Sequence, residues 1–198
     1  MSELKLVIFD LDGTLVDSAL DFDLMRADLG ISAGEPILEK LEAITDPIRK
    51  NKMLEIIHQH ELEGALRSKI YPGVRKFLKY LDHRDIKKAI LTRNSTFCTK
   101  ATLEKHQLAF EYICTRDDVK FQKPNPEGLF KILNHFSMIA CDSIFVGDFT
   151  FDMLAAKNAE MKSLYFGEKD EIAKLATERF NDYKKIYSQI SILKMNKL

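Results

Sequence analysis

The sequence predicts an α/β protein in which helices cover both faces of a parallel β-sheet, the doubly wound arrangement. Three observations support this prediction. Short apolar runs recur along the chain, helical patterns lie between them, and a strandless segment of about 55 residues separates the first run from the others. Near-continuous apolar strands that alternate with helices are typical of parallel sheets covered on both faces. A chain of 198 residues is long enough for one domain of ordinary size with a small insertion.

The predicted strands and helices alternate in a regular way. Each expected strand is short and apolar, and Pro126 suits the first turn of a helix. We expect strands at 4–9, 87–92, 112–114, 143–147 and 163–166, and helices at 74–82, 95–106, 126–136 and 149–159.

The strandless segment is predicted to be a small inserted helical cap. A crossover between parallel strands needs only a dozen or more residues, and this segment is much longer. We expect helices at 17–29, 36–44 and 47–67 within it. The predicted domains are therefore a core, 1–16 with 72–198, and an inserted cap, 17–71. The tail from 170 to 198 is expected to be a helix that closes the core and is rich in Lys towards its end.

The composition excludes several classes of protein. Lys plus Arg number 30 and Asp plus Glu number 30, so the long-range attraction that draws proteins to nucleic acid or to anionic membranes is not indicated. No signal peptide is evident, and no run approaches the roughly 18 apolar residues of a membrane span. Cys98, Cys114 and Cys141 lack metal-ligand spacing and are expected to be reduced thiols. We expect a cytoplasmic protein, a monomer or weak dimer, that binds neither nucleic acid nor membrane.

Polar residues gather at the carboxyl ends of the predicted strands. Asp10 and Asp12 follow the first strand, Thr92 follows the second and Asp148 follows "SIFVG". Lys123 lies in a loop that must reach the same edge if the helix after it packs on the sheet. Ligands of open parallel sheets bind at this edge. The sequence therefore predicts a polar crevice there.

Two carboxylates placed one residue apart repel each other unless something offsets their charge. A divalent cation such as Mg²⁺, which prefers oxygen ligands, would do so. A raised pKa that neutralises one carboxylate is the other possibility, and both can hold at different steps of a reaction. Asp152 lies one helical turn after Asp148 and so faces the same way.

Four segments carry a family resemblance: "DLDGTL" at 10–15, "LTRN" at 91–94, "KPNP" at 123–126 and "GDFTFD" at 147–152. In order and spacing they resemble the four motifs of the haloacid dehalogenase superfamily, and in particular its phosphoglycolate phosphatase-like branch. Any one of the four would be weak evidence, but four in order at predicted strand ends are specific. The resemblance spans nearly the whole chain.

The resemblance implies a role for each matching residue. Asp10 is expected to be the nucleophile that forms an aspartyl phosphate. Asp12 is expected to be the general acid and then the general base, giving Mg²⁺ only its backbone carbonyl. Thr92 and Lys123 are expected to contact the phosphoryl group, and Asp148 to complete the metal ligands.

Two further residues of these motifs are assigned supporting roles. Asp152 is expected to hold a metal-bound water or Lys123, and Gly13 to allow the turn that aims backbone N–H groups at phosphate. The simpler interpretations are a first-turn acid favoured by the helix dipole for Asp152, and helix or turn caps for Asp12 and Asp148. Arg93 and Asn94 are left without a role.

The predicted reaction is hydrolysis of a small phosphomonoester, phosphoglycolate-like or a sugar phosphate. Dehalogenases of the superfamily lack an acid at the second position of the first motif, so Asp12 favours phosphoryl transfer. A phosphomutase and a catalytically idle binding relative are the alternatives. Arg26 is a candidate anchor for a substrate carboxylate, since a guanidinium can grip a carboxylate with two hydrogen bonds. An exposed ion pair with Asp23 explains Arg26 equally well.

Overall fold

The protein is built around a six-stranded, all-parallel β-sheet, seen in a computed structural model that describes residues 4–187 and 189–190. The strand order is β5-β4-β1-β6-β7-β8, so β1 lies near the centre, between β4 and β6. The strands are β1 (Leu6–Phe9), β4 (Lys87–Leu91), β5 (Tyr112–Cys114), β6 (Ser143–Gly147), β7 (Lys162–Phe166) and β8 (Glu178–Phe180).

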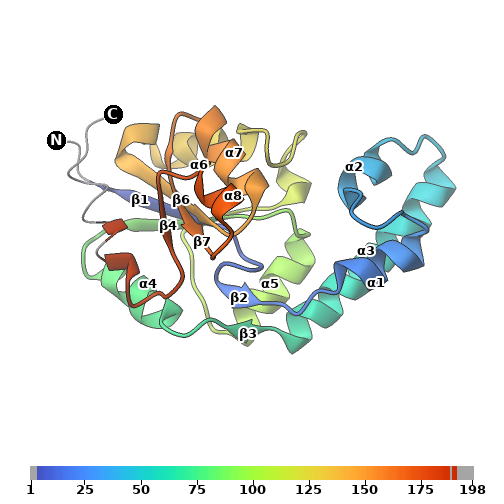
Figure 1. Cartoon of the computed structure of the whole chain (residues 1–198), viewed down its shortest axis with the longest axis horizontal. Coiled ribbons are helices and arrows are strands. Elements are labelled where there is room, and N and C mark those ends of the chain that lie inside the picture. Colours follow the sequence, from blue (N-terminus) through green and yellow to red (C-terminus); the bar gives the residue numbers. More distant parts are fainter. Residues whose placement is uncertain (1–3, 188, 191–198) are drawn as a thin grey trace.

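Helices cover both faces of this sheet (Figure 1). The side chains of β1 alternate between the two faces. Val7 and Phe9 point into the hydrophobic cluster under α4, whereas Leu6 and Ile8 point into the cluster under α6 and α7. Both sets are fully buried, and because both faces of the strand are covered, its sequence is a continuous apolar run. The predicted doubly wound fold is confirmed. The core helices are α4 (Val74–Asp82), α5 (Thr96–Lys105), α6 (Glu127–Phe136), α7 (Thr150–Asn158) and α8 (Asp170–Ala173), with 3-10 turns at Arg116–Asp118 and Ala140–Asp142.

Three helices between β1 and β4 stand to one side of the sheet (Figure 1). They are α1 (Phe22–Leu29), α2 (Ile37–Glu42) and α3 (Pro47–Arg67), here called the helical segment. The segment has a hydrophobic cluster of its own, separate from those of the sheet, and α3 also packs against α5. It therefore has a hydrophobic core of its own and packs on the rest of the protein mainly through α3 against α5.

The expectation that this region holds no strand was wrong. Val16–Asp17 (β2) and Lys69–Ile70 (β3) pair antiparallel where the chain leaves and re-enters the core. Each strand is only two residues long, so no apolar periodicity can be recognised in the sequence. They join the two chain passages at the base of the helical segment.

The expectation of one helix from 170 to 198 was wrong for much of the part that is described. α8 and residues 186, 187, 189 and 190 are helical, but the chain between them is not, and residues 188 and 191–198 lie outside the described range. After α8 the chain forms β8, which extends the sheet beside β7. Phe180 and Tyr183 are buried there, and the Tyr183 hydroxyl donates to the carbonyl of Thr14 at 2.9 Å. Burial of these rings favours a strand and turn over a solvated helix. Among the described residues, no helix combines the length and apolar character that a bilayer span needs.

Candidate active site

The loop after β1 places its side chains against the end of β6. The Asp10 amide still donates to the Val146 carbonyl, at 2.8 Å, so Asp10 continues the strand. Gly13 has a φ of 81°, and a Cβ there would lie 2.3 Å from an oxygen of Asp148. Only glycine fits this position without displacing that carboxylate. Thr14 then donates its hydroxyl to Asp148 Oδ1 at 2.8 Å.

Lys123 lies at the centre of the site and is buried. Its Nζ donates to Asp10 Oδ1 at 2.7 Å, to Asp152 Oδ1 at 2.6 Å and to the Leu91 carbonyl at 3.1 Å. The other oxygen of Asp152 accepts from the Phe149 amide at 2.9 Å and so caps α7. Burial would lower the pKa of Lys123, but the two carboxylates outweigh it and the pKa is raised. The lysine is therefore held in its charged form.

Three carboxylates crowd together beside this lysine. Asp10, Asp148 and Asp152 each offer an oxygen within 4.8 Å of the others. Burial raises the pKa of Asp10 well above its ordinary value, opposed by Lys123. Burial, followed by the charge of Asp152, raises the pKa of Asp148 to about 7. An all-oxygen donor set with excess negative charge suits Mg²⁺, so the residues present fit the predicted metal.

Asp12 lies apart from this cluster, on the side of β4. Asn94 Nδ2 donates to Asp12 Oδ2 at 3.0 Å, and the Asn94 amide donates to Thr92 Oγ1 at 3.0 Å. Burial raises the pKa of Asp12, while the hydrogen bond from Asn94 lowers it. Sequence reasoning left Asn94 without a role. Its position two residues after Thr92, at a strand end, was the available signal.

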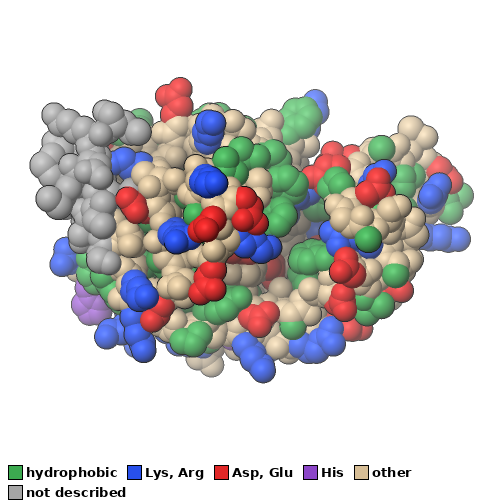
Figure 2. Space-filling view, viewed as in Figure 1, with side chains coloured by type: hydrophobic (Ala, Val, Ile, Leu, Met, Phe, Trp, Pro, Cys, Tyr) green, Lys and Arg blue, Asp and Glu red, His purple; other side chains and the backbone are tan. Residues whose placement is uncertain are grey.

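These residues line one cavity of about 470 Å³ between the strand ends and the helical segment. Figure 2 shows the hollow between the two parts of the molecule, with hydrophobic side chains along its margin. All eight residues singled out in the sequence line it: Asp10, Asp12, Gly13, Arg26, Thr92, Lys123, Asp148 and Asp152.

Arg26 reaches this cavity but already has two partners. Its Nη1 pairs with Asp23 Oδ1 at 2.8 Å, and its Nε donates to the Glu35 carbonyl at 2.9 Å. The expected ion pair with Asp23 is therefore present. The role of substrate anchor stays a prediction, and these contacts favour the ion-pair interpretation.

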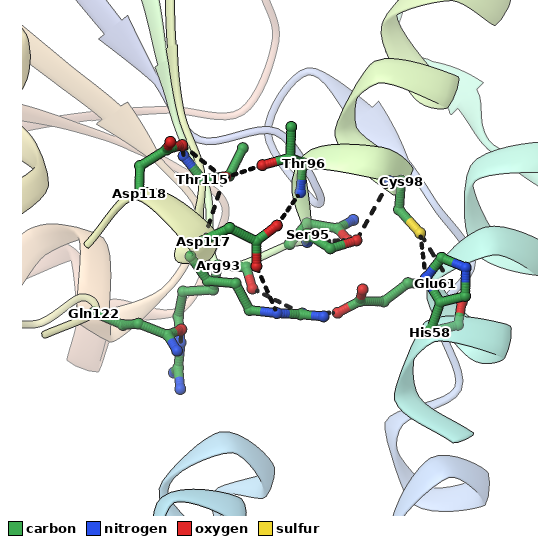
Figure 3. A network of polar contacts seen from close by, with 12 residues as sticks. His58, Glu61, Arg93, Ser95, Thr96, Cys98, Thr115, Asp117, Asp118 and Gln122 are labelled. Carbon is green, nitrogen blue, oxygen red and sulfur yellow. Dashed lines mark hydrogen bonds and ion pairs between the residues drawn. The ribbon is translucent and has the colours of Figure 1, made fainter. Parts of the chain in front are cut away.

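Sequence reasoning missed two further ionic groups that line the cavity, Arg93 and Glu61 (Figure 3). Arg93 follows β4, pairs with Glu39 of α2 at 2.7 Å and lies over the Phe151 ring. Glu61 of α3 pairs with Arg116 of the core. Both pairs join the helical segment to the core. Arg93 lies in the quoted segment LTRN but had no assigned role, and Glu61 is a single acid on an amphipathic helix, so no sequence signal pointed to these contacts.

Comparison with known proteins agrees with this geometry. The family model described as "Haloacid dehalogenase-like hydrolase" matches residues 27–166. The phosphoglycolate phosphatase of Pseudomonas fluorescens strain Pf0-1 is 30% identical over 184 residues, covering 80% of this chain and 67% of that protein. Pyrophosphatase PpaX of Halalkalibacterium halodurans is 30% identical over 184 residues, covering 83% and 84%.

Solved structures show the same fold. A hydrolase from Pseudomonas syringae superposes with a TM-score of 0.81 at 20% identity, covering 95% of this chain and 98% of that one. A haloacid dehalogenase-like hydrolase from Bacteroides fragilis superposes with a TM-score of 0.79 at 20% identity, covering 93% and 100%. The predicted membership is confirmed by the family model and the relatives: the chain belongs to the haloacid dehalogenase-like hydrolases.

Proposed function

We propose that this protein is a Mg²⁺-dependent phosphatase that hydrolyses a small phosphomonoester through an aspartyl phosphate on Asp10. The observation that carries the proposal is the buried contact of Lys123 with Asp10 and Asp152, at the floor of a cavity that Asp12 also lines. The relatives named as phosphatases support the same reaction class. A pure binding module would need neither a nucleophile nor an acid.

The first half of the reaction transfers the phosphoryl group to Asp10. An oxygen of the Asp10 carboxylate attacks phosphorus, and the bond from phosphorus to the ester oxygen breaks. Asp12, whose pKa is raised by burial, gives its proton to that leaving oxygen. Lys123 and the Thr92 hydroxyl contact the phosphoryl oxygens and stabilise the charge in transfer.

The second half releases phosphate. Asp12, now a carboxylate, takes a proton from water, and the water oxygen attacks phosphorus. The bond between phosphorus and Asp10 breaks, and the free carboxylate returns. Asn94 holds one oxygen of Asp12 and so leaves the other to handle both protons.

Asp10, Asp148 and the backbone carbonyl of Asp12 would hold Mg²⁺. When bound, the ion supplies positive charge that offsets the crowded carboxylates and the phosphoryl oxygens. Asp152 orients Lys123, in keeping with its contact. The predicted cap, 17–71, would close over the substrate and exclude bulk water.

Hydrolysis of p-nitrophenyl phosphate by the purified protein tests the proposal. We expect phosphate release that requires Mg²⁺ and stops on chelation. Release that survives exhaustive chelation would contradict the metal assignment. The absence of any release would favour the idle relative, and transfer of phosphate to a sugar phosphate in place of water would favour the phosphomutase.

A further inference from the structure

Glu61 holds a buried carboxylate oxygen that the protein itself does not satisfy. The residue lies on α3, and its side chain is only 8% exposed. Oε1 accepts a hydrogen bond from Arg116 Nη1, and the same guanidinium nitrogen donates to the Arg93 carbonyl at 3.3 Å (Figure 3). Oε2 has no hydrogen-bond partner among the described residues. Leaving such an acceptor buried without a donor destabilises the folded protein, so its retention calls for a reason.

The unpartnered oxygen belongs to a residue that lines the active-site cavity. Asp12 Oδ1 is a second buried acceptor without a partner, and it lines the same cavity. The two carboxylates are close enough for the charge of Asp12 to raise the pKa of Glu61, although burial is the larger cause. One acceptor comes from the core and the other from the helical segment. A side-chain hydroxyl lies near each carboxylate, that of Ser18 near Asp12 and that of Ser95 near Glu61, and neither makes a hydrogen bond to the unpartnered oxygen.

The cations that line the cavity already have carboxylate partners. Arg26 pairs with Asp23, Arg93 pairs with Glu39, and Lys123 is shared between two aspartates. The remaining lining is largely apolar, from side chains that include Phe22, Met25, Ile37, Ile57 and Phe151. A carboxylate on the leaving group would meet acceptors of its own sign there.

We propose that Glu61 is a specificity-determining residue that accepts a hydrogen bond from a hydroxyl or ammonium group on the leaving part of the substrate. The inference rests on the proposed function, because Asp12 marks the leaving-group side of the reaction. The preferred substrates are then hydroxylated or amine-bearing phosphomonoesters. Phosphoglycolate, whose leaving group carries a carboxylate, is disfavoured.

Four substrates of nearly equal size separate these chemistries: 2-hydroxyethyl phosphate, 2-aminoethyl phosphate, ethyl phosphate and phosphoglycolate. For the wild-type protein we expect kcat/KM to be at least about tenfold higher for the first two than for the last two. The hydroxyl and ammonium compounds compared with each other show which donor the site prefers. A wild-type preference for phosphoglycolate or ethyl phosphate would overturn the proposal without any variant.

Glu61→Gln exchanges the unpartnered acceptor for a donor. The amide oxygen can keep the hydrogen bond from Arg116, and the NH₂ group then takes the place of Oε2. We expect kcat/KM to fall about tenfold or more for the hydroxyl and ammonium substrates, most for the ammonium, and to rise for phosphoglycolate. Glu63→Gln is the matched control, two residues along α3, exposed and paired with Arg67; it should leave all four values unchanged.

A purely structural role for Glu61 has a different signature. Loss of support for Arg116 would lower kcat/KM for all four substrates and for p-nitrophenyl phosphate alike, and that result would overturn the proposal. If Glu61→Gln does not fold, the double variant Glu61→Gln/Arg116→Gln replaces the ion pair with a neutral amide pair. It should show the same change in the order of kcat/KM among the four substrates. Failure of the proposed function is recognised separately, since wild-type protein would then not hydrolyse p-nitrophenyl phosphate with Mg²⁺.

Discussion

The sheet edge and the helical segment contribute to the same cavity in different ways. At the sheet edge, Lys123 is held by two carboxylates and a backbone carbonyl, and Asp10 and Asp148 follow the paired strands β1 and β6. The helical segment has its own hydrophobic cluster, and its ionic contacts with the core include Arg93–Glu39 and Arg116–Glu61. One side is a buried network of mutual partners, and the other is an apolar wall with a few polar groups.

This difference suggests a division of labour. A constellation set by strand register is rigid, as phosphoryl transfer requires. A wall carried by separate helices can change its side chains without disturbing the sheet. Changes at the sheet edge should therefore remove the reaction, whereas changes in the helical segment should alter which substrate is chosen.

The largest expected effect comes from Asp10→Asn, which removes the proposed nucleophile at the sheet edge. An amide is a poor nucleophile of nearly the same shape, so kcat should fall at least about 10⁴-fold while the thermal melt stays cooperative. Asp85→Asn is the control, since Asp85 is exposed with a φ of 52°, a conformation that Asn accepts readily. Turnover by folded Asp10→Asn protein within tenfold of wild type would exclude Asp10 as nucleophile.

Asp12→Asn sharpens the assignment of acid and base at the same edge. We expect kcat to fall by roughly 10²- to 10⁴-fold for alkyl phosphates, the usual worth of general acid–base catalysis. The defect should be smaller in the first half of the reaction for p-nitrophenyl phosphate, because its leaving group needs little protonation. Pre-steady-state release of p-nitrophenol measures that half directly. Equal decreases in the rate of this first half for substrates with good and with poor leaving groups would contradict the role of Asp12 as general acid.

The metal can be tested apart from activity. Mg²⁺ that binds only the folded protein should stabilise it, by about 2.7 kcal/mol when its concentration is a hundred times its dissociation constant. The melting temperature of wild-type protein should therefore rise with Mg²⁺. Asp148→Asn, which removes one charged ligand, should abolish most of that rise. An equal rise in the variant would remove Asp148 from the metal site.

The smallest predicted effect concerns a contact between the core and the helical segment, that of His106 with Ser68. His106, at the end of α5, lies 2.8 Å from the hydroxyl of Ser68, which follows α3. Burial, followed by the charges of Lys105 and Arg75, lowers the pKa of His106 below 6.5. The unfolded chain therefore binds this proton first as the pH falls, so the free energy of unfolding should decrease below about pH 6.5.

His106→Gln is the variant that isolates this effect. It removes the titrating group and should flatten the part of the pH dependence that His106 causes. Thermal melts of both proteins between pH 7.5 and 5.5 measure the difference. If the melting temperatures of the wild-type protein and the variant change in parallel with pH, His106 does not contribute to the pH dependence of stability in this range.

The sequence predicted the fold and the sheet-edge residues because both follow from local signals. Apolar runs mark buried strands, and the residues directly after them must lie at one edge of a parallel sheet. Glu61 could not be predicted, since one acid on an amphipathic helix is most often solvated and only tertiary packing buries it. β8 was missed for a similar reason: Glu178–Phe180 is short and polar, and burial of Phe180 becomes evident only beside β7.

The most direct test of the account is to trap the phosphoryl group on the protein. Substrate and Mg²⁺ are mixed with wild-type protein and with Asp12→Asn, which should slow the second half of the reaction. The mixture is then quenched in acid and reduced with borohydride, which converts an aspartyl phosphate to homoserine. Peptide mass spectrometry should find homoserine at position 10, with more in the variant. Modification at another residue, or none during turnover, would contradict the claim that Asp10 carries the reaction.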